Sequence, residues 1–180
     1  MTSLDRPDLR LRASWAAAVA EFAETGEFMH GSGLWLFDDL DTSEAGAPAV
    51  IEYLLSQDDP DTELPEDRVP STYYWMTEDD EFVGYLALRH RLNAKLLEEG
   101  GHIGYAVRPS RRREGHASRA LVLALDRAAA LGLGRVLVTA DDDNVGSWQV
   151  IERAGGRHED TRNGMRRYWI ETALARRAPA

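Results

Sequence analysis

Residues 100–156 carry the strongest structural signal in the chain. An alternating apolar run, His102 to Val107, leads through the basic turn Arg112-Arg113-Glu114-Gly115-His116-Ala117 into a long Ala/Leu-rich segment with helical spacing. This order predicts a strand, a turn and a helix. The first N–H groups of such a helix lack intrahelical acceptors and lie at the positive end of the helix dipole. The turn is therefore a predicted phosphate site.

The residue types in this turn suit a multiply charged anion. Gly115 allows a ligand to approach the backbone where a Cβ would block it. Arg111, Arg112 and Arg113 can neutralise a group such as a pyrophosphate. An ordinary strand-to-helix connection with solvated arginines has the same local sequence, so the turn alone leaves both interpretations open.

The composition is that of a globular protein, with 43% hydrophobic and 29% charged residues in 180. This length favours a single domain over residues 1–180. The absence of cysteine excludes disulfides, thiolate metal sites and a cysteine nucleophile. No run approaches a membrane span and the N-terminus lacks a signal-peptide pattern, so we expect a cytoplasmic protein without a membrane partner.

The charge is unevenly divided between the two halves of the chain. Residues 1–90 carry 5 basic and 20 acidic side chains, whereas residues 91–180 carry 16 basic and 11 acidic ones. The positive half contains the turn and suits an anionic cofactor, and the acidic half suits a cationic acceptor such as a protonated amine, although an acidic surface also serves solubility. Nucleic acid is not an expected partner, because the acidic half would repel its backbone.

Hydrophobic periodicity and turn residues predict an alternation of helices and strands. Helices are expected over residues 11–23, 48–56 and 115–131, and from about residue 143 to 154. Strands are expected over residues 71–77, 82–89, 102–108 and 135–140, with a closing hairpin of residues 157–160 and 166–172 that turns at Asn163-Gly164.

Several motifs occur together in a diagnostic order. Arg112-x-x-Gly115-x-Ala117 follows Val107-x-Pro109, Asn144-x-x-Ser147 precedes Gly155, and the run Gly101-His102-Ile103-Gly104-Tyr105 continues to Arg167-Tyr168-Trp169-Ile170. Over about residues 71–170 the chain resembles the GNAT superfamily of acyl-CoA-dependent N-acyltransferases, and within it a poorly characterised bacterial branch of predicted acetyltransferases. The resemblance implies an α/β (α+β) fold, with a mixed central sheet and helices on both faces.

The resemblance also divides the chain and assigns its cofactor contacts. Residues 1–70 become a helical, acceptor-side region, residues 71–172 the cofactor-binding core, and residues 173–180 a mobile tail. Acetyl-CoA is the implied cosubstrate. Its pantetheine would pair with the backbone at Val107, and its pyrophosphate would meet the N–H groups from Arg113 to Ser118. The implied contacts are Val107, Arg112, Arg113, Gly115, His116, Ala117, Ser118, Asn144 and Ser147, although Asn144 could equally serve as a helix N-cap.

The proton-transfer groups are less well defined. Many members of the superfamily carry a tyrosine acid seven residues after the motif asparagine, where this chain has Ile151. For the base, the strand before the turn offers Tyr105 and His102, which the two-residue strand period places on opposite sides. Glu99 and His90 are more remote candidates.

These features together predict an N-acetyltransferase that moves an acetyl group to a primary amine by direct attack in a ternary complex. The acceptor walls are expected in the aromatic loop Phe28–Phe37 and in the hairpin near Arg162–Arg166. A weakly catalytic or non-catalytic acyl-CoA sensor is the alternative, and a nucleotide-binding domain is disfavoured by the lack of its glycine motifs. No metal site is predicted, because the histidines form no ligand-spaced pair. The acceptor, the acyl length and the oligomeric state, including a possible homodimer, stay open.

Overall fold

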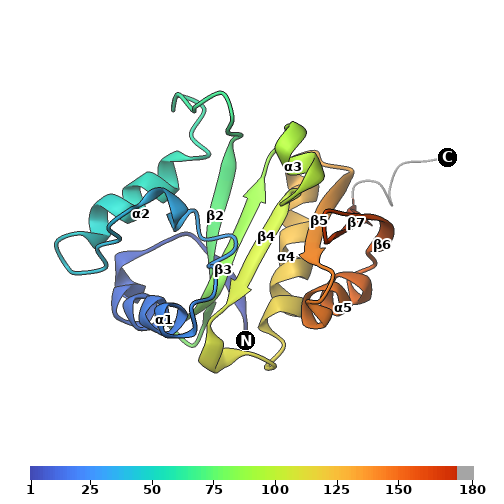
Figure 1. Cartoon of the computed structure of the whole chain (residues 1–180). Coiled ribbons are helices and arrows are strands. Elements are labelled where there is room, and N and C mark those ends of the chain that lie inside the picture. The colour runs from blue at the N-terminus through green and yellow to red at the C-terminus, as the bar shows by residue number, and fades with distance from the viewer. Residues whose placement is uncertain (174–180) are drawn as a thin grey trace.

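The computed structural model describes residues 1–173, and the residues 174–180 of the expected mobile tail lie outside this range (Figure 1). Its centre is one seven-stranded sheet in the order β1-β2-β3-β4-β5-β7-β6. Only β4 and β5 pair in parallel; the other neighbours are antiparallel. The strands are β1 (Ser3–Asp5), β2 (Ser71–Glu78), β3 (Glu81–Arg89), β4 (Ile103–Val107), β5 (Arg135–Asp141), β6 (Arg157–Arg162) and β7 (Met165–Glu171).

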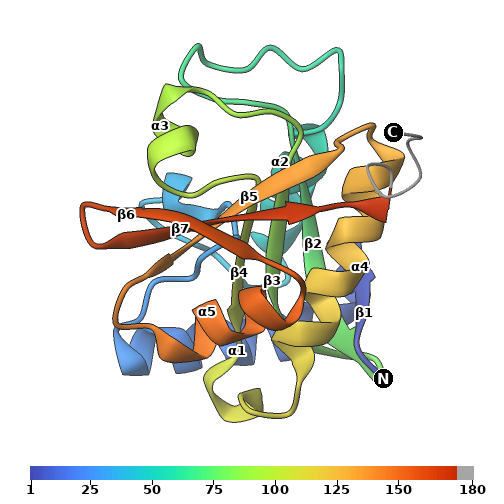
Figure 2. The same ribbon diagram turned by 90° about the vertical axis from the view of Figure 1, so that its right-hand side faces the viewer.

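Helices cover both faces of this mixed sheet, as expected from the resemblance (Figures 1 and 2). One face carries α1 and α2, and the other carries α4 and α5. The helices are α1 (Arg12–Thr25), α2 (Ala47–Ser56), α3 (Ala94–Glu98), α4 (His116–Ala130) and α5 (Val145–Arg153), with short 3₁₀ turns η1 (Leu9–Leu11), η2 (Leu34–Leu36) and η3 (Pro109–Arg111). Within residues 1–173 no helix is long and apolar enough to cross a membrane.

Two hydrophobic cores hold these layers together. Under α1, the indole of Trp15 stacks on Trp75 with 5.2 Å between ring centroids, and its Nε1 donates a hydrogen bond to the hydroxyl of Tyr85 (2.9 Å). Behind the sheet, Leu121 of α4 and Ile151 of α5 are completely buried against β5 and β7. The bond between Trp15 and Tyr85 removes the cost of burying those two polar groups, whereas Nε1 of Trp75 is buried without a partner among the described residues.

The sequence patterns located all the longer elements and missed two short ones. β1 adds an edge strand within the region expected to be helical, and it pairs with β2. α3 is a five-residue helix whose N-cap, Asn93, accepts a hydrogen bond from the N–H of Leu96 (2.9 Å). Three-residue strands and single-turn helices are too short for periodicity to identify them.

Candidate active site

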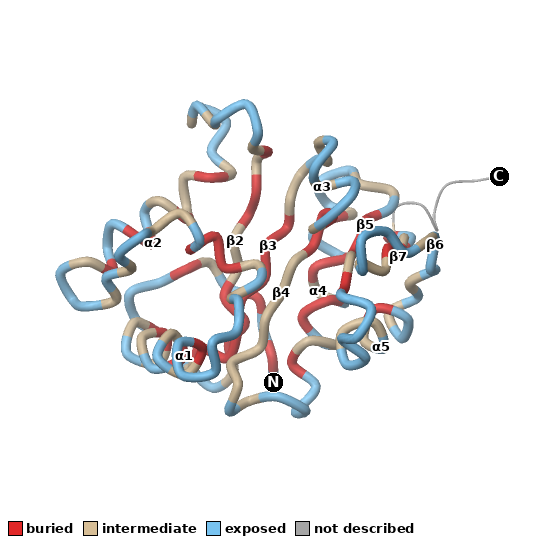
Figure 3. Tube along the Cα trace, viewed as in Figure 1, coloured by how far each residue is buried: buried red, intermediate tan, exposed pale blue. Residues whose placement is uncertain are grey.

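The central strand β4 has one free edge. It pairs with β3 along its length, but its only ladder contact with β5 is Ile103 to Val138. The N–H of Arg108 donates to the carbonyl of Val83 (2.9 Å), so by alternation the amides of Tyr105 and Val107 face away from β3. Figure 1 shows β4 and β5 diverging, and in Figure 3 β4 is half-buried where β3 beside it is buried. This exposed edge can accept an added strand-like ligand.

The basic turn lies at the end of β4 and is open to solvent. Arg113 (φ +65°) and Gly115 (φ +88°) both take the left-handed conformation. A Cβ built on Gly115 would have no atom within 4 Å, so the space above the glycine is empty. Within residues 1–173, no acceptor meets the main-chain N–H groups from Arg113 to Ser118. These converging donors fit the predicted pyrophosphate site.

The three arginines of the turn have different environments. Arg111 is held by the carboxylates of Glu78 (3.0 Å), Glu81 and Glu114 (3.0 Å). The prediction that Arg111 neutralises a bound anion is therefore wrong. Arg112 forms a two-point ion pair with Glu27, in which Nη1 lies 2.9 Å from Oε1, and its Nε donates to the carbonyl of Val107 (3.2 Å).

Arg113 is exposed, and within the described residues it has no ion-pair partner. It is therefore the guanidinium of the turn that is free to meet a phosphate.

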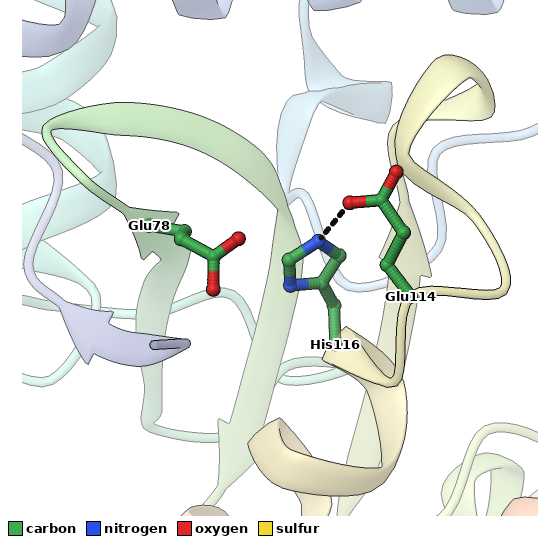
Figure 4. A group of neighbouring side chains, drawn as sticks. All are labelled: Glu78, Glu114 and His116. Carbon is green, nitrogen blue, oxygen red and sulfur yellow. Dashed lines mark hydrogen bonds and ion pairs between the residues drawn. The ribbon is translucent and has the colours of Figure 1, made fainter.

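The side chain of His116 supports the turn from behind. Its Nε2 lies 3.2 Å from Glu114 Oε2 and its Nδ1 lies 2.9 Å from Thr2 Oγ1, so only its main-chain N–H faces the turn. Figure 4 shows Glu78 and Glu114 on opposite sides of the imidazole, the one metal-like trio among residues 1–173. Arg111 already neutralises both carboxylates, so we assign this cluster to anchoring the turn.

Asn144 and Ser147 lie at the start of α5, on the far side of the open edge. The carboxamide oxygen of Asn144 accepts a hydrogen bond from the N–H of Ser147 (3.1 Å), so Asn144 does act as the N-cap. Its amide nitrogen has no partner within the described residues and stays available to a ligand.

Tyr105 reaches across the gap between β4 and β5. Its hydroxyl lies 2.8 Å from the hydroxyl of Ser147 and 3.3 Å from the Ser147 carbonyl. Burial raises the pKa of Tyr105 to about 12, partly offset by the bond to Ser147. A phenol with that pKa stays protonated at neutral pH, so Tyr105 can donate a proton but is unsuited to be the base.

His102 lies inside the protein. Its Nδ1 accepts a hydrogen bond from the N–H of Leu137 (2.9 Å), and its ring packs edge-on against Trp169. Burial, together with the charge of Arg89, lowers the pKa of His102 to about 4. With 6% of its surface exposed and no place in the cavity wall, His102 is not positioned to act as the base.

This placement of His102 predicts a pH dependence of stability. The native imidazole resists protonation until about pH 4, whereas the unfolded one binds a proton near 6.5. The contribution of His102 to the free energy of unfolding is therefore fully present above about pH 6.5. It is lost as the pH falls towards 4, which lowers the free energy of unfolding by at most about 3 kcal/mol. In His102→Asn, whose carboxamide oxygen can still accept from Leu137, urea unfolding should give a flatter slope over this range.

His90, whose pKa burial also lowers, adds a slope of the same sign, so the variant must be compared with the wild type. Equal slopes in the two proteins would contradict the prediction.

The remaining candidates for proton transfer, His90, Glu99 and the position of Ile151, also differ in their access to the cavity described below. His90 bonds to Thr72 (2.8 Å) and does not line the cavity, whereas Glu99 is exposed on its wall. Ile151 is completely buried, so no acid acts from that position.

A cavity of about 480 Å³ lies beside β4, where the acceptor walls are expected. Phe28, His30 and Trp35 of the aromatic loop line it, as does Met165 of the closing hairpin, while Phe37 packs instead on Tyr53. The cavity continues to the gap between β4 and β5, where its wall includes Tyr105, Asn144 and Ser147. One cavity therefore connects the expected acceptor walls with the expected cofactor groove.

Sequence reasoning missed a polar group in this cavity: Arg68, Tyr73 and Arg89. Tyr73 and Arg89 lie in strand patterns and Arg68 in a solvated connection, so nothing local distinguished them. The aromatic loop was predicted to line the acceptor site through its aromatic rings, and the sequence suggested no role for the imidazole of His30.

A family model described as the acetyltransferase (GNAT) family matches residues 38–156. This range runs from before α2 to the end of α5 and contains both cofactor motifs. The chain belongs to the acetyltransferase (GNAT) family. Membership confirms the resemblance to the GNAT superfamily and the implied enzyme class, an acyl-CoA-dependent N-acetyltransferase.

Solved structures of GNAT proteins share the fold. RimJ of Mycobacterium smegmatis, in complex with CoA-disulfide, has a TM-score of 0.66 at 21% identity, with 96% of this chain and 82% of that chain covered. The microcin C7 self-immunity acetyltransferase MccE, in complex with acetyl-CoA and AMP, has a TM-score of 0.66 at 14% identity, with 94% and 92% covered. No curated protein sequence matches the chain.

Proposed function

We propose that the protein transfers the acetyl group of acetyl-CoA to a primary amine in a ternary complex. The observation that carries this proposal is that three features lie next to one another. They are the free edge of β4, the unpaired amides of the turn that follows β4, and the cavity beside β4. A thioester laid along β4 would present its acyl carbon to an amine in the cavity.

The cofactor contacts follow from this placement. The outward-facing amide of Val107 suits the pantetheine, as does its carbonyl, which also accepts from Nε of Arg112. The N–H groups from Arg113 to Ser118 suit the pyrophosphate. The bound CoA and acetyl-CoA of RimJ and MccE, which share this fold, support acetyl-CoA as the cosubstrate.

The reaction needs one proton donor and one proton acceptor. The neutral amine nitrogen forms a bond to the acetyl carbon, the carbon–sulfur bond breaks, CoA leaves as a thiolate and takes up one proton, and the new amide nitrogen loses one. We assign the donor role to Tyr105, whose protonated hydroxyl lies at the gap between β4 and β5. His30 and Glu99, both exposed on the cavity wall, are the groups able to accept the amine's proton, directly or through water.

The first test combines binding with turnover. Calorimetry should detect acetyl-CoA binding that weakens with salt, since charged contacts to phosphate are screened. A thiol-release assay with a panel of amines should then show CoA release that depends on the amine. Tight binding without amine-dependent release over a broad panel would favour the sensor alternative, and no binding at low ionic strength would exclude both.

Tyr105→Phe tests the donor. We expect kcat to fall about 100-fold with little change in the KM for acetyl-CoA, because the variant loses the proton donated to the leaving thiolate. Ionisation of Tyr105 should not limit the wild-type rate below about pH 10, since its pKa is raised to about 12. An unchanged kcat in the variant would assign that proton to water.

Glu27→Gln tests the access of Arg112 to the cofactor. Glu27 holds the guanidinium of Arg112 and places a negative charge beside the turn. Removing that charge should tighten acetyl-CoA binding by about 3- to 10-fold at low ionic strength, with a smaller gain at high salt. Glu24→Gln, at an exposed position of α1 without an ion pair among the described residues, is the control. Equal affinities in Glu27→Gln and the wild type would show that Arg112 does not contact the phosphates.

A further inference from the structure

Arg89, at the end of β3, is a mostly buried cation without a carboxylate partner. Its Nη1 donates to the carbonyls of Gly100 (2.9 Å) and Gly101 (3.1 Å), which leaves Nε and Nη2 without partners in the described residues. Burial lowers its pKa, as expected for a charge taken out of water. The chain has 31 acidic side chains, yet no ion pair joins any described one to Arg89. A buried charge of this kind is costly unless an anion meets it.

Two neighbours extend this positive region. Tyr73 lies close enough to Arg89 and Arg68 for both charges to act on its hydroxyl, which has no hydrogen-bond partner within residues 1–173. Arg68 donates from Nη1 to the hydroxyl of Tyr53 (2.7 Å), and its guanidinium lies 4.9 Å from the ring centroid of Trp35. Arg68 also lacks an ion pair among the described residues. The group Arg68, Tyr73 and Arg89 therefore presents hydrogen-bond donors and positive charge to the cavity.

The position of this group relates it to the reaction. A Cβ built on Gly104 would lie 3.5 Å from both Nη1 and Nη2 of Arg89, so the guanidinium lies against β4 one residue before Tyr105. The unpaired edge of β4 begins at the same point. An anion bound there would lie a short distance from the amine that attacks the thioester.

We propose that Arg89, with Arg68 and Tyr73, binds a carboxylate carried by the acceptor, so that the substrate is a primary amine with a carboxylate a few bonds away, as in an amino acid. This inference rests on the proposed N-acetyl transfer and names its substrate class. A guanidinium matches the two oxygens of a carboxylate with two parallel N–H groups, and the Tyr73 hydroxyl can add a third donor.

The remainder of the cavity wall suits the other end of such a molecule. Asp67, Glu99 and Asp141 line it, and each is exposed without an ion pair to a described residue. They can attract the ammonium group while the carboxylate is held by Arg89. The cationic acceptor expected from the charge distribution becomes, in this proposal, a zwitterion or an acidic N-terminal residue.

The experiment uses matched acceptors with the full chain and acetyl-CoA. The panel pairs free amino acids with their carboxamides, and adds short peptides that begin with Asp or Glu and 2-aminoethyl phosphate. We expect kcat/KM for the best carboxylate-bearing acceptor to exceed that of its amide by about 100-fold, because the neutral amide leaves the guanidinium of Arg89 without a counter-charge. A preference for free amino acids would identify them as the source of the carboxylate, and a preference for the acidic peptides would identify a peptide N-terminus.

Variants show whether Arg89 is responsible. In Arg89→Met the acid-to-amide ratio of kcat/KM should collapse to within about 3-fold of unity, and in Arg68→Gln it should fall about 10-fold. The ratio is independent of how much enzyme is folded, and Arg91→Gln, at an exposed position outside the cavity, should leave it unchanged.

The inference would be overturned if the wild type used amides as well as acids, or if it acetylated no carboxylate-bearing amine. It would equally be overturned if 2-aminoethyl phosphate were the preferred acceptor, or if Arg89→Met kept the wild-type acid-to-amide ratio. Acetyl-CoA calorimetry on every variant keeps these outcomes apart from a failure of the proposed function itself, in which the wild type would not bind acetyl-CoA.

Discussion

Gly115→Ala should weaken acetyl-CoA binding by about 100-fold, or about 3 kcal/mol. The new methyl group would occupy the open space above the turn, where the diphosphate must approach the main-chain N–H groups. The φ of +88° also opposes a side chain, so the turn would tend to relax and misalign its donors. Calorimetry with acetyl-CoA at low ionic strength measures the effect directly.

Gly132→Ala is the matched control for this change. Gly132 lies just beyond the other end of α4, with φ +83° and no atom within 4 Å of a built Cβ. Both variants carry the same backbone strain, of about 1 kcal/mol, but only one has its methyl group in the proposed phosphate site. Similar affinities in the two variants would mean that the diphosphate binds elsewhere.

Gly31→Ala should lower kcat/KM for the amine by about 100-fold and destabilise the fold by about 2 kcal/mol or more. The loop that carries Phe28 and His30 crosses β4 so closely that a Cβ on Gly31 would lie 2.2 Å from the carbonyl oxygen of Gly104. The loop must lift off the sheet, and the acceptor wall moves with it. Acetyl-CoA affinity should stay within about 3-fold, because the pyrophosphate turn lies beyond the other end of β4.

Gly26→Ala separates strain from displacement. Gly26 ends α1 with φ +65°, and nothing lies within 4 Å of its built Cβ. This variant should cost about 1 kcal/mol of stability and leave the steady-state constants unchanged. If Gly31→Ala behaved in the same way, the loop would not form a functional wall of the cavity.

Most of the fold could be predicted from the sequence because its longer elements carry their own periodicity. α1 buries Trp15, Ala18 and Phe22 on one face and ends at a left-handed glycine, and the closing hairpin turns at Asn163-Gly164. The two elements that were missed, β1 and α3, are stabilised by pairing and capping rather than by an apolar pattern of their own.

The sequence also predicted the open turn and the helix cap of the candidate cofactor site, whereas it did not resolve the environments of the candidate proton-transfer groups. The turn motif places its N–H groups by local geometry, which adjacent residues determine. The strand period correctly put Tyr105 and His102 on different sides, but it could not show that one meets Ser147 and the other Leu137. The two contacts join residues that are separated by 42 and 35 positions in the chain, and they depend on how β4 and β5 separate.

The amino-acid sequence by itself determined the order of the elements, the open turn between β4 and α4 and the family, because each depends on residues close together along the chain. Only the tertiary structure decided that Arg111 pairs with Glu78 and Glu81, and that Arg89 is mostly buried at the cavity wall without a carboxylate partner among the described residues. The physical reason is that the charge state and availability of a side chain depend on what surrounds it, and packing brings those surroundings from distant parts of the chain.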